Sequence, residues 1–181
     1  MKLIFILFLT TTFISTNIFS TEDAENCSIK NVPTEERSFS NNFSGVFNGK
    51  RLDYVASLKE KVIYEKDNPN EPMASFFYTE YIVNSDKNRP VIFSFNGGPG
   101  SASLWLHMGV LGPKVIKVPS DASDDGSAPY KIEDNKLSPL SDADLVFIDP
   151  IGTGYSRAIG CHEPEEFWGV SEDPKIIAEF I

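Results

Sequence analysis

Hydrophobic residues in this chain occur in short runs, and the pattern of these runs predicts several strands. The segment "MASFFYTEYIVN" (73–84) is rich in aromatic and β-branched residues, which favour strands. Two further segments, "RPVIFSF" (89–95) and "ADLVFID" (143–149), are continuous apolar runs. Runs of this kind are expected of strands that are covered on both faces of a sheet.

One stretch beyond residue 100 has helical rather than strand spacing. Its apolar residues are Leu104, Trp105, Met108 and Leu111. Because these positions fall on one side of a helix, they predict a helix with a single apolar stripe. A second helix is expected over "EDPKIIAEFI" (172–181), where Asp173 is placed to cap the helix and Pro174 to open it.

Polar segments between the runs predict turns and a loop. "FNGK" (47–50) contains Asn and Gly, which supply the positive φ of a tight hairpin turn. "PSDASDDGSAPYKIEDNK" (119–136) is polar, contains Pro and Gly, and predicts a surface loop. Hairpins followed by buried strands joined through helices indicate a mixed α/β sheet with an antiparallel start. We expect one domain over residues 43–181, preceded by a loose polar arm over residues 21–42.

The first twenty residues have the organisation of a secretory signal peptide. Basic Lys2 precedes an apolar run over residues 3–19, and small and acidic residues follow. Threonine and serine interrupt the run, so it is poor as a permanent membrane span, which needs about 20 mostly apolar residues. We expect a signal peptide over residues 1–20, a secretory route and no stable membrane anchor; an uncleaved anchor is the alternative.

Composition narrows the possible partners. The 181 residues carry a formal net charge of -10, which argues against binding to the phosphates of nucleic acid. Two cysteines, Cys27 and Cys161, either pair with each other or pair with partners outside this chain. With only two histidines beside them, no metal site is expected, nor any other cofactor. Asn26 and Asn42 begin tripeptides that fit the glycosylation sequon.

The glycine-rich segment "NGGPG" (96–100) follows the second predicted strand directly. A tight turn explains glycines at this place without any function, because glycine adopts positive φ at little cost. The functional interpretation is that bare backbone lets a ligand approach and directs N–H groups into one spot, where they stabilise an oxyanion. Ligand crevices of α/β sheets lie at the carboxyl ends of strands, which is where this segment is expected.

The second glycine segment, "IDPIGTGYSRA" (148–158), fits two known motifs poorly. A dinucleotide fingerprint would need Gly or Ala at position 157, which is Arg157. A nucleophile elbow centred on Ser156 would need strand, turn and helix in immediate succession, and the predicted strand ends near Asp149. We therefore do not expect Ser156 to be a nucleophile. His107 is expected to be a packed or surface residue, and His162 beside Cys161 is a weak thiol and base pair.

Two segments in the right order resemble the serine carboxypeptidases of peptidase family S10. "FSFNGGPGSASLWLHMGVLGP" resembles that family's NGGPG region, and "SDADLVFIDPIGTGYS" resembles the strand and glycine-rich loop that follow. The lead-in from Phe43 is also similar, so the resemblance covers residues 43–181. It implies the N-terminal part of an α/β-hydrolase fold and release of C-terminal amino acids by a Ser-His-Asp triad.

The resemblance also assigns roles to individual residues. The backbone N–H of Gly98 matches an oxyanion-hole donor. The side-chain amide of Asn96 and the N–H of Gly97 match the group that binds the substrate's terminal carboxylate, and the loop over residues 150–156 matches a wall near the substrate pocket. The implied partner is a peptide or protein substrate with a free C-terminus.

The chain also departs from the family pattern. Ser94 stands where many members have Trp, Ser101 stands where they have a disulfide cysteine, and Asp149-Pro150 shortens their Asp-Gln-Pro. The triad of the family lies beyond the position that matches Ile181, so we expect an N-terminal fragment that is inactive alone. The alternative is a secreted non-catalytic binding domain, or pseudoenzyme, derived from the same fold.

Overall fold

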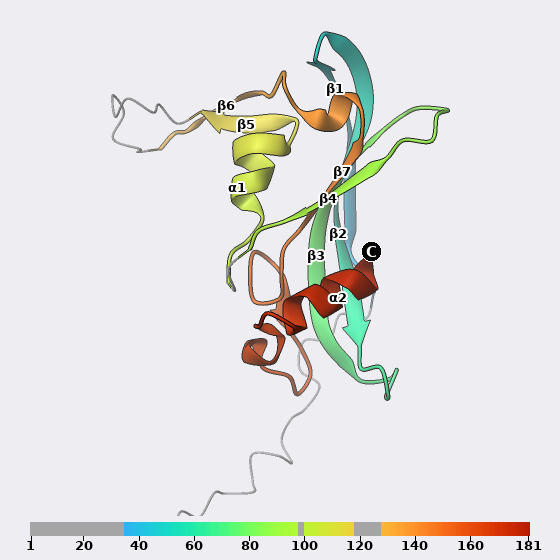
Figure 1. Cartoon of the computed structure of the whole chain (residues 1–181), viewed down its shortest axis with the longest axis vertical. Helices are drawn as coiled ribbons and strands as arrows, with labels where there is room; N and C mark the ends of the chain where they lie inside the picture. Colours follow the sequence, from blue (N-terminus) through green and yellow to red (C-terminus); the bar gives the residue numbers. More distant parts are fainter. Residues whose placement is uncertain (1–34, 98–99, 118–127) are drawn as a thin grey trace, which may run out of the picture.

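The computed structural model describes residues 35–97, 100–117 and 128–181, without the side chain of Asp173. A mixed sheet forms its centre, with the strand order β1-β2-β3-β7-β4 and a short strand, β8, paired to β3 (Figure 1). The strands are β1 (Ser38–Phe47), β2 (Lys50–Tyr64), β3 (Pro72–Val83), β4 (Val91–Phe95), β7 (Asp144–Ile148) and β8 (Arg157–Ala158). The expectation of a mixed sheet with antiparallel N-terminal strands is confirmed.

The first three strands form an antiparallel meander. The turn between β1 and β2 consists of Asn48 and Gly49, whose φ values are 47° and 76°. Positive φ at both central residues gives the turn a twist that matches the strands, as the segment "FNGK" predicted. The strand predicted over residues 73–84 is also present, as β3.

Strand β1 begins earlier than the sequence indicated. Residues 38–42 belong to this strand and pair with residues 55–59 of β2, although we expected a loose arm through residue 42. The polar side chains of this part gave no strand signal, and backbone pairing with β2 compensates for their lack of burial. The remainder of the expected arm, residues 21–34, lies outside the described residues, as does the expected signal peptide.

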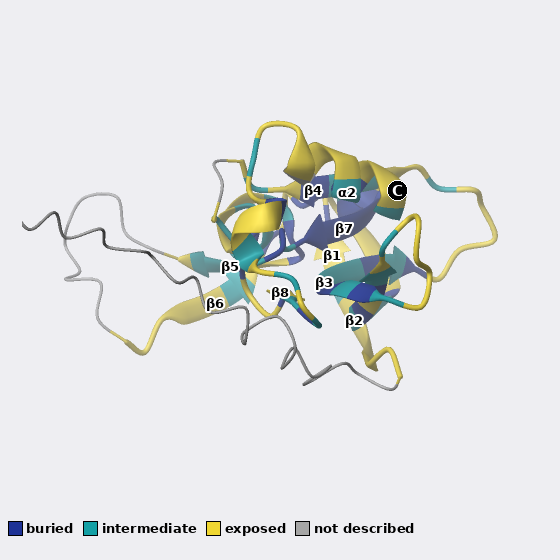
Figure 2. Cartoon of the chain, turned by 90° about the horizontal axis from the view of Figure 1, so that it is seen from below, coloured by how far each residue is buried: buried dark blue, intermediate teal, exposed yellow. Residues whose placement is uncertain are grey.

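The two apolar runs form neighbouring parallel strands, β4 and β7. Every residue of β7 is buried, as expected of a strand that is covered on both faces (Figure 2). Only Ser94 is buried in β4, because β4 is the last strand of the order within the described part of the chain. The prediction of two covered faces was therefore right for β7 and wrong for β4.

Apolar side chains form one core cluster on each face of the sheet. The first cluster contains Phe47, Tyr54, Tyr81, Val83, Leu140, Leu145 and Phe147. The second contains Ala74, Phe76, Val146, Ile148, Ile151, Phe167 and Ile177. Helix α2 (Glu172–Phe180) belongs to the second cluster, and Phe180 at its end contacts the rings of Phe76 and Tyr78.

The helical stretch after the NGGPG segment differs from its prediction. It consists of one α-turn, α1 (Leu104–Leu106), followed by a π-helical turn, η1 (His107–Leu111). Leu106 and Leu111 pack against the core, whereas Leu104 and Trp105 are exposed. A π-turn contains more residues per turn than an α-helix, so it shifts the inward-facing positions away from the predicted stripe.

The predicted surface loop contains a short strand. β6 (Lys131–Asp134) pairs with β5 (Lys114–Lys117) in a separate two-stranded ribbon, and residues 118–127 lie outside the described residues. Two short 3₁₀ turns, η2 (Pro139–Ser141) and η3 (Pro164–Phe167), lie before and after β7 in the sequence. Helix α2 has Ser171 as its N-cap, and not Asp173 as expected.

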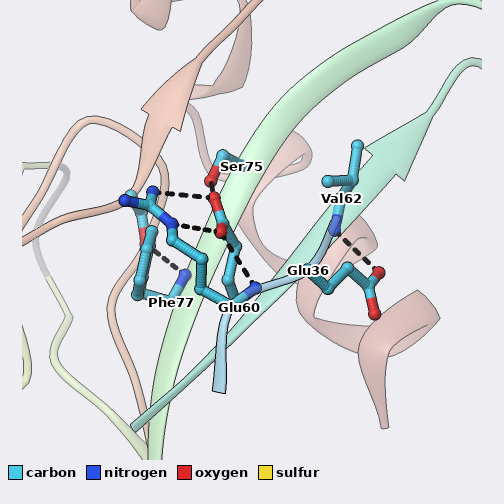
Figure 3. A network of polar contacts seen from close by, with 7 residues as sticks. Glu36, Glu60, Val62, Ser75 and Phe77 are labelled. Atoms are coloured by element: carbon cyan, nitrogen blue, oxygen red, sulfur yellow. Dashed lines mark hydrogen bonds and ion pairs between the residues drawn. The ribbon is translucent and has the colours of Figure 1, made fainter. Parts of the chain in front are cut away.

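An ion pair anchors the chain just before β1. The guanidinium of Arg37 donates to both carboxylate oxygens of Glu60, at 2.6 and 3.1 Å, and Ser75 donates to the same carboxylate (Figure 3). The Glu60 side chain is fully buried, and the Arg37 guanidinium lies 5.0 Å from the ring centre of Phe77. The start of the sheet is thus fixed to β2 and β3 by a buried carboxylate.

Candidate active site

The two glycine-rich segments meet at one edge of the sheet. Strands β4 and β7 are parallel, and Phe95 lies opposite Ile148 in their register. Asn96 and Asp149 are the next residues of the two strands, so the loops that contain them leave the sheet side by side. This is the carboxyl edge of the parallel pair, where α/β sheets place ligand crevices.

Ser103 connects the two loops through its hydroxyl and its backbone. Its Oγ accepts a hydrogen bond from the backbone N–H of Asn96 at 3.2 Å and donates to the carbonyl of Ile148. The residue is almost fully buried, at 1% exposure. Ser103 therefore holds the backbone of Asn96 in place, a role that the sequence analysis missed because a single serine in a loop has no distinctive spacing.

Asp149 makes the second connection between the loops. Its Oδ1 accepts a hydrogen bond from the backbone N–H of Ser103 at 2.9 Å. Its Oδ2 faces Gly154, where an added Cβ would lie 2.1 Å from this oxygen. Burial raises the pKa of the Asp149 carboxyl above its ordinary value, and the hydrogen bond from Ser103 opposes this shift. Position 154 therefore has no room for a side chain while Asp149 holds this geometry.

Internal hydrogen bonds fix the loop over residues 150–156. Thr153 Oγ1 donates to the carbonyl of Pro150 at 2.7 Å, and the N–H of Ser156 donates to the carbonyl of Thr153 at 2.8 Å. The indole N–H of Trp168 donates to the carbonyl of Ile151 at 3.0 Å. Several backbone groups of this loop are thus satisfied by hydrogen bonds within the fold.

Ser156 has a structural environment. Its side chain is fully buried, its Oγ donates to the carbonyl of Asp149 at 2.7 Å, and the same oxygen accepts the backbone N–H of Phe77 at 2.8 Å. A hydroxyl with both roles occupied by backbone groups is not available for attack on a substrate. This agrees with the expectation that Ser156 is not a nucleophile.

The residues assigned to carboxylate binding lie at the open side of this arrangement. Asn96 is half-buried and Gly97 is exposed, and an added Cβ at Gly97 would have no atom within 4 Å. Among the described residues, no side chain or backbone atom outside its chain neighbours therefore fills the space that a Cβ at Gly97 would take. Gly98, the expected oxyanion donor, lies outside the described residues.

His107 begins the π-turn η1 and packs against the sheet. Its imidazole stacks on the ring of Phe147 with centroids 4.5 Å apart, and its Nε2 lies 2.6 Å from the hydroxyl of Tyr81. Burial lowers the pKa of His107 to about 4, so the imidazole is neutral around pH 7. His107 is thus a packed histidine, as expected, and its contacts are with Tyr81 on β3 and Phe147 on β7.

His162 and Cys161 do not form a nucleophile and base pair. Cys161 is disulfide-bonded, and Cys27 lies outside the described residues. The Nδ1 of His162 lies 2.8 Å from Glu166 Oε2, and its Nε2 lies 3.9 Å from Glu71 Oε1. Among the described residues, no group of three or more His, Cys, Asp or Glu side chains is arranged to hold a metal ion.

Comparison with known proteins shows to which family a chain with these two loops belongs. The family model for serine carboxypeptidase matches residues 54–163, a range that contains both loops. The chain belongs to the serine carboxypeptidase family. This confirms the resemblance that was inferred from the NGGPG and PIGTGYS segments.

Curated relatives match about half of the chain. A carboxypeptidase Y homolog A of Ajellomyces capsulatus (strain NAm1 / WU24) is 34% identical over 103 residues, which are 56% of this chain and 17% of that protein. A carboxypeptidase Y homolog A of Leptosphaeria maculans is 36% identical over 95 residues, which are 52% of this chain and 16% of that protein. The matched region thus spans 16–17% of the length of these relatives.

Proposed function

We propose that this chain is the N-terminal portion of an α/β-hydrolase domain that acts as a serine-type carboxypeptidase. The observation that supports this most directly is the parallel pairing of Phe95 with Ile148, which places the Asn96 and Asp149 loops at the same sheet edge. This pairing brings the loop that contains Asn96 and Gly97 next to the loop that follows Asp149. Such an edge suits recognition of a peptide end.

In this proposal, Asn96 and Gly97 bind the terminal carboxylate of the substrate. The side-chain amide of Asn96 and the N–H of Gly97 are neutral donors, and hydrogen bonds to an ionised acceptor are stronger than those between neutral groups. Ser103 and Asp149 keep these donors in position, through the backbone contacts at 3.2 and 2.9 Å. A preorganised pair of donors costs little free energy when the carboxylate arrives.

Gly98 is proposed to donate its N–H to the oxyanion of the acyl-transfer intermediate. The nucleophilic Ser and the Asp and His of the triad have no assigned position within this chain. We therefore expect the 181 residues to bind a carboxylate ligand without hydrolysing it. Release of a C-terminal amino acid from a blocked dipeptide by the purified chain would contradict this.

The proposed location is the secretory route, with residues 1–20 as the signal peptide. Within the described part of the chain, no helix combines the length and the apolar character that a membrane span requires. The signal peptide can be tested by expressing the full chain in a eukaryotic secretory host and determining the N-terminus of the released protein. A released chain that still begins at Met1 would contradict cleavage.

The carboxylate role of Asn96 can be tested by binding measurements with matched ligands. A blocked dipeptide with a free carboxylate and the same dipeptide as its C-terminal amide are titrated into ¹⁵N-labelled chain, and the Gly97 amide resonance is followed. We expect the free acid to bind at least about tenfold more tightly, because a hydrogen bond to a charged group contributes about 1.5–3 kcal/mol. Asn96→Ala and Asn96→Asp should both remove this preference.

The control variant is Asn84→Ala, which changes an exposed asparagine in the loop after β3. It should retain the preference for the free acid. Equal binding of acid and amide by the unchanged chain would overturn the carboxylate role. The chain could prefer the free acid while the full-length protein hydrolyses no peptide. That result would support the alternative, a non-catalytic binding domain.

A further inference from the structure

Strand β1 forms one lateral edge of the main sheet. Within the described residues it pairs only with β2, so its other side has no strand partner. The strand is ten residues long, and the first seven of these are exposed. A strand of this length with a free side offers a row of backbone N–H and C=O groups to any other strand.

Within the residues that the structure describes, β1 itself carries little of the usual protection against such pairing. Natural edge strands are commonly protected by charged side chains, proline, bulges or a covering element. The sequence "SFSNNFSGVF" contains no charged residue and no proline, and its register with β2 runs without interruption from Ser38 to Phe47. It also exposes apolar side chains, since Phe39 is 62% and Phe43 46% accessible.

Asn42 lies in the middle of this edge and begins the tripeptide Asn42-Phe43-Ser44, which fits the N-glycosylation sequon. Its side chain is exposed, and it lies opposite Val55 in the register. Its neighbours on the same strand face are Ser40 and Ser44, two residues away on either side. The small serines leave room around the Asn42 amide for a bulky substituent.

We propose that Asn42 carries an N-linked glycan and that this glycan prevents the β1 edge from pairing with another strand. The proposal rests on the secretory route proposed above and is independent of carboxypeptidase activity. A branched sugar is much wider than the spacing of about 4.8 Å between paired strands. At the centre of β1, it excludes a partner strand from both halves of the edge.

The modification is a group transfer from a lipid-linked oligosaccharide pyrophosphate, the donor of the eukaryotic secretory route. A bond forms between Nδ2 of Asn42 and the anomeric carbon C1 of the first sugar. The bond from C1 to the pyrophosphate oxygen breaks, and the lipid pyrophosphate leaves with that electron pair. Nδ2 loses one of its two protons, and no atom is oxidised or reduced. The hydrophilic product projects from the strand face of Ser40 and Ser44.

Glycan attachment is tested by translating the full chain with microsomes. The Asn26→Gln variant leaves Asn42 as the remaining sequon of the two, and protease protection reports entry into the lumen. We expect a protected product that loses the mass of one glycan on treatment with an N-glycosidase. Asn26→Gln/Asn42→Gln should lose this mass difference, and Asn26→Gln/Asn41→Gln should keep it.

Two results would overturn the attachment site. A protected chain without a glycan at Asn42 would contradict the site while leaving the secretory route intact. A chain that remains accessible to protease would contradict the secretory route, and the glycan proposal with it. Neither result bears on the carboxylate role of Asn96, because the binding measurement uses the chain without a glycan.

Protection of the edge is tested by the polypeptide mass of secreted proteins, measured by light scattering over a concentration series. We expect the wild type and Asn41→Gln to be monomeric, and Asn42→Gln to reach at least twice the monomer mass. Asn42→Lys also lacks the glycan but places a charge at the centre of the edge, so it should restore the monomer. The far-ultraviolet spectra of the variants should be alike, since Asn42 is exposed.

A monomeric Asn42→Gln protein at every concentration would overturn the protective role. Association of Asn42→Gln and Asn42→Lys to the same extent would also overturn it, because β1 would then not be the contact surface. Association of the glycosylated wild type through β1, shown by its loss in Phe43→Lys, would identify a second copy of the chain as the partner of this edge.

Discussion

The hydroxyl of Tyr81 and the Nε2 of His107 lie 2.6 Å apart, on the sheet face of the first core cluster. Tyr81 belongs to β3, whereas His107 begins the π-turn that follows the NGGPG segment. Both side chains contact the ring of Phe147 on β7. This pair therefore ties the π-turn η1 to strands β3 and β7.

The first prediction concerns pH. The pKa of His107 is lowered from 6.5 to about 4 by burial, so the unfolded chain binds a proton at a higher pH than the folded chain. Its contribution to stability is complete above pH 6.5 and decreases as the pH falls towards 4. The loss at low pH is about 3 kcal/mol, since one pKa unit corresponds to about 1.4 kcal/mol. Urea unfolding between pH 7 and pH 4 measures this change.

The control for this prediction is His107→Phe, which keeps a ring in the same place and removes the titrating group. Other groups titrate in both proteins, so the difference between the two pH profiles isolates the histidine. The difference should increase steadily below pH 6.5. Parallel profiles over the whole range would show that His107 binds protons equally in both states.

The second prediction concerns the hydroxyl of Tyr81. Tyr81→Phe leaves Nε2 of the half-buried His107 without the hydroxyl that it contacts, and a polar group left unsatisfied in the protein interior costs about 1–3 kcal/mol. We expect a loss of unfolding free energy in this range, measured by denaturant unfolding at pH 7. Tyr64→Phe removes a hydroxyl from an exposed ring at the end of β2 and should change stability by about 0.5 kcal/mol or less. Equal effects of the two substitutions would contradict the importance of the pair.

The third prediction concerns the close contact between Gly154 and Asp149. An added Cβ at residue 154 would lie 2.1 Å from Asp149 Oδ2, and the residue has a φ of 52°. Gly154→Ala should therefore lower the free energy of unfolding more than Gly49→Ala does. Gly49 also has a positive φ, of 76°, but an added Cβ there would meet no atom within 4 Å. For Gly49→Ala we expect a loss of about 1 kcal/mol of unfolding free energy, caused by the positive φ of the backbone alone. The loss of unfolding free energy in Gly154→Ala, measured by denaturant unfolding, should be larger than this value. Because Asp149 accepts the N–H of Ser103, this substitution should also shift the amide resonance of Ser103.

The fourth prediction concerns the ion pair between Arg37 and Glu60. Arg37 lowers the pKa of the Glu60 carboxyl, chiefly through the hydrogen bonds between their side chains. The pair therefore stabilises the fold above the ordinary carboxyl pKa of 4.5, and this contribution is lost as the pH falls through the lower folded value. Arg37→Met should lower the denaturant midpoint at pH 7 more than Glu60→Gln, because it leaves a buried carboxylate without its cation.

A double-substitution cycle completes this test. In Arg37→Met/Glu60→Gln the buried charge and its partner are both absent, so the double variant should be more stable than Arg37→Met alone. Lys50→Met serves as a control, because its ion pair with Asp142 is exposed on both sides. A midpoint for Arg37→Met that equals that of Lys50→Met would show that the anchor before β1 contributes nothing beyond a surface pair.

Several elements were predictable because their signal is local. The aromatic and β-branched residues of β3, the continuous apolar run of β7 and the Asn48-Gly49 turn each specify their conformation from within a few residues. The family was also identifiable, since the NGGPG and PIGTGYS segments are short, contiguous and in a fixed order. Backbone preferences of glycine and side-chain patterns need no distant partner to be recognised.

Other features depend on residues that are far apart in the sequence. Ser103 and Asp149 are 46 positions apart, and Tyr81 and His107 are 26 apart, yet each pair forms a direct hydrogen bond. The π-turn at His107 likewise changed which apolar residues face inward, so that Leu104 and Trp105 are exposed despite their helical spacing. Strand β1 formed through its pairing with β2, although its own residues carry little strand signal.

The sequence by itself therefore determined the local elements, the family and the residues proposed to bind a substrate carboxylate. Only the tertiary structure decided how those residues are held, which histidine stacks on Phe147 and which strands lie at the edges of the described sheet. The physical reason is that hydrogen bonding and burial between distant segments depend on strand order and register. These arise when β4 and β7 pair in parallel and place Asn96 beside Asp149.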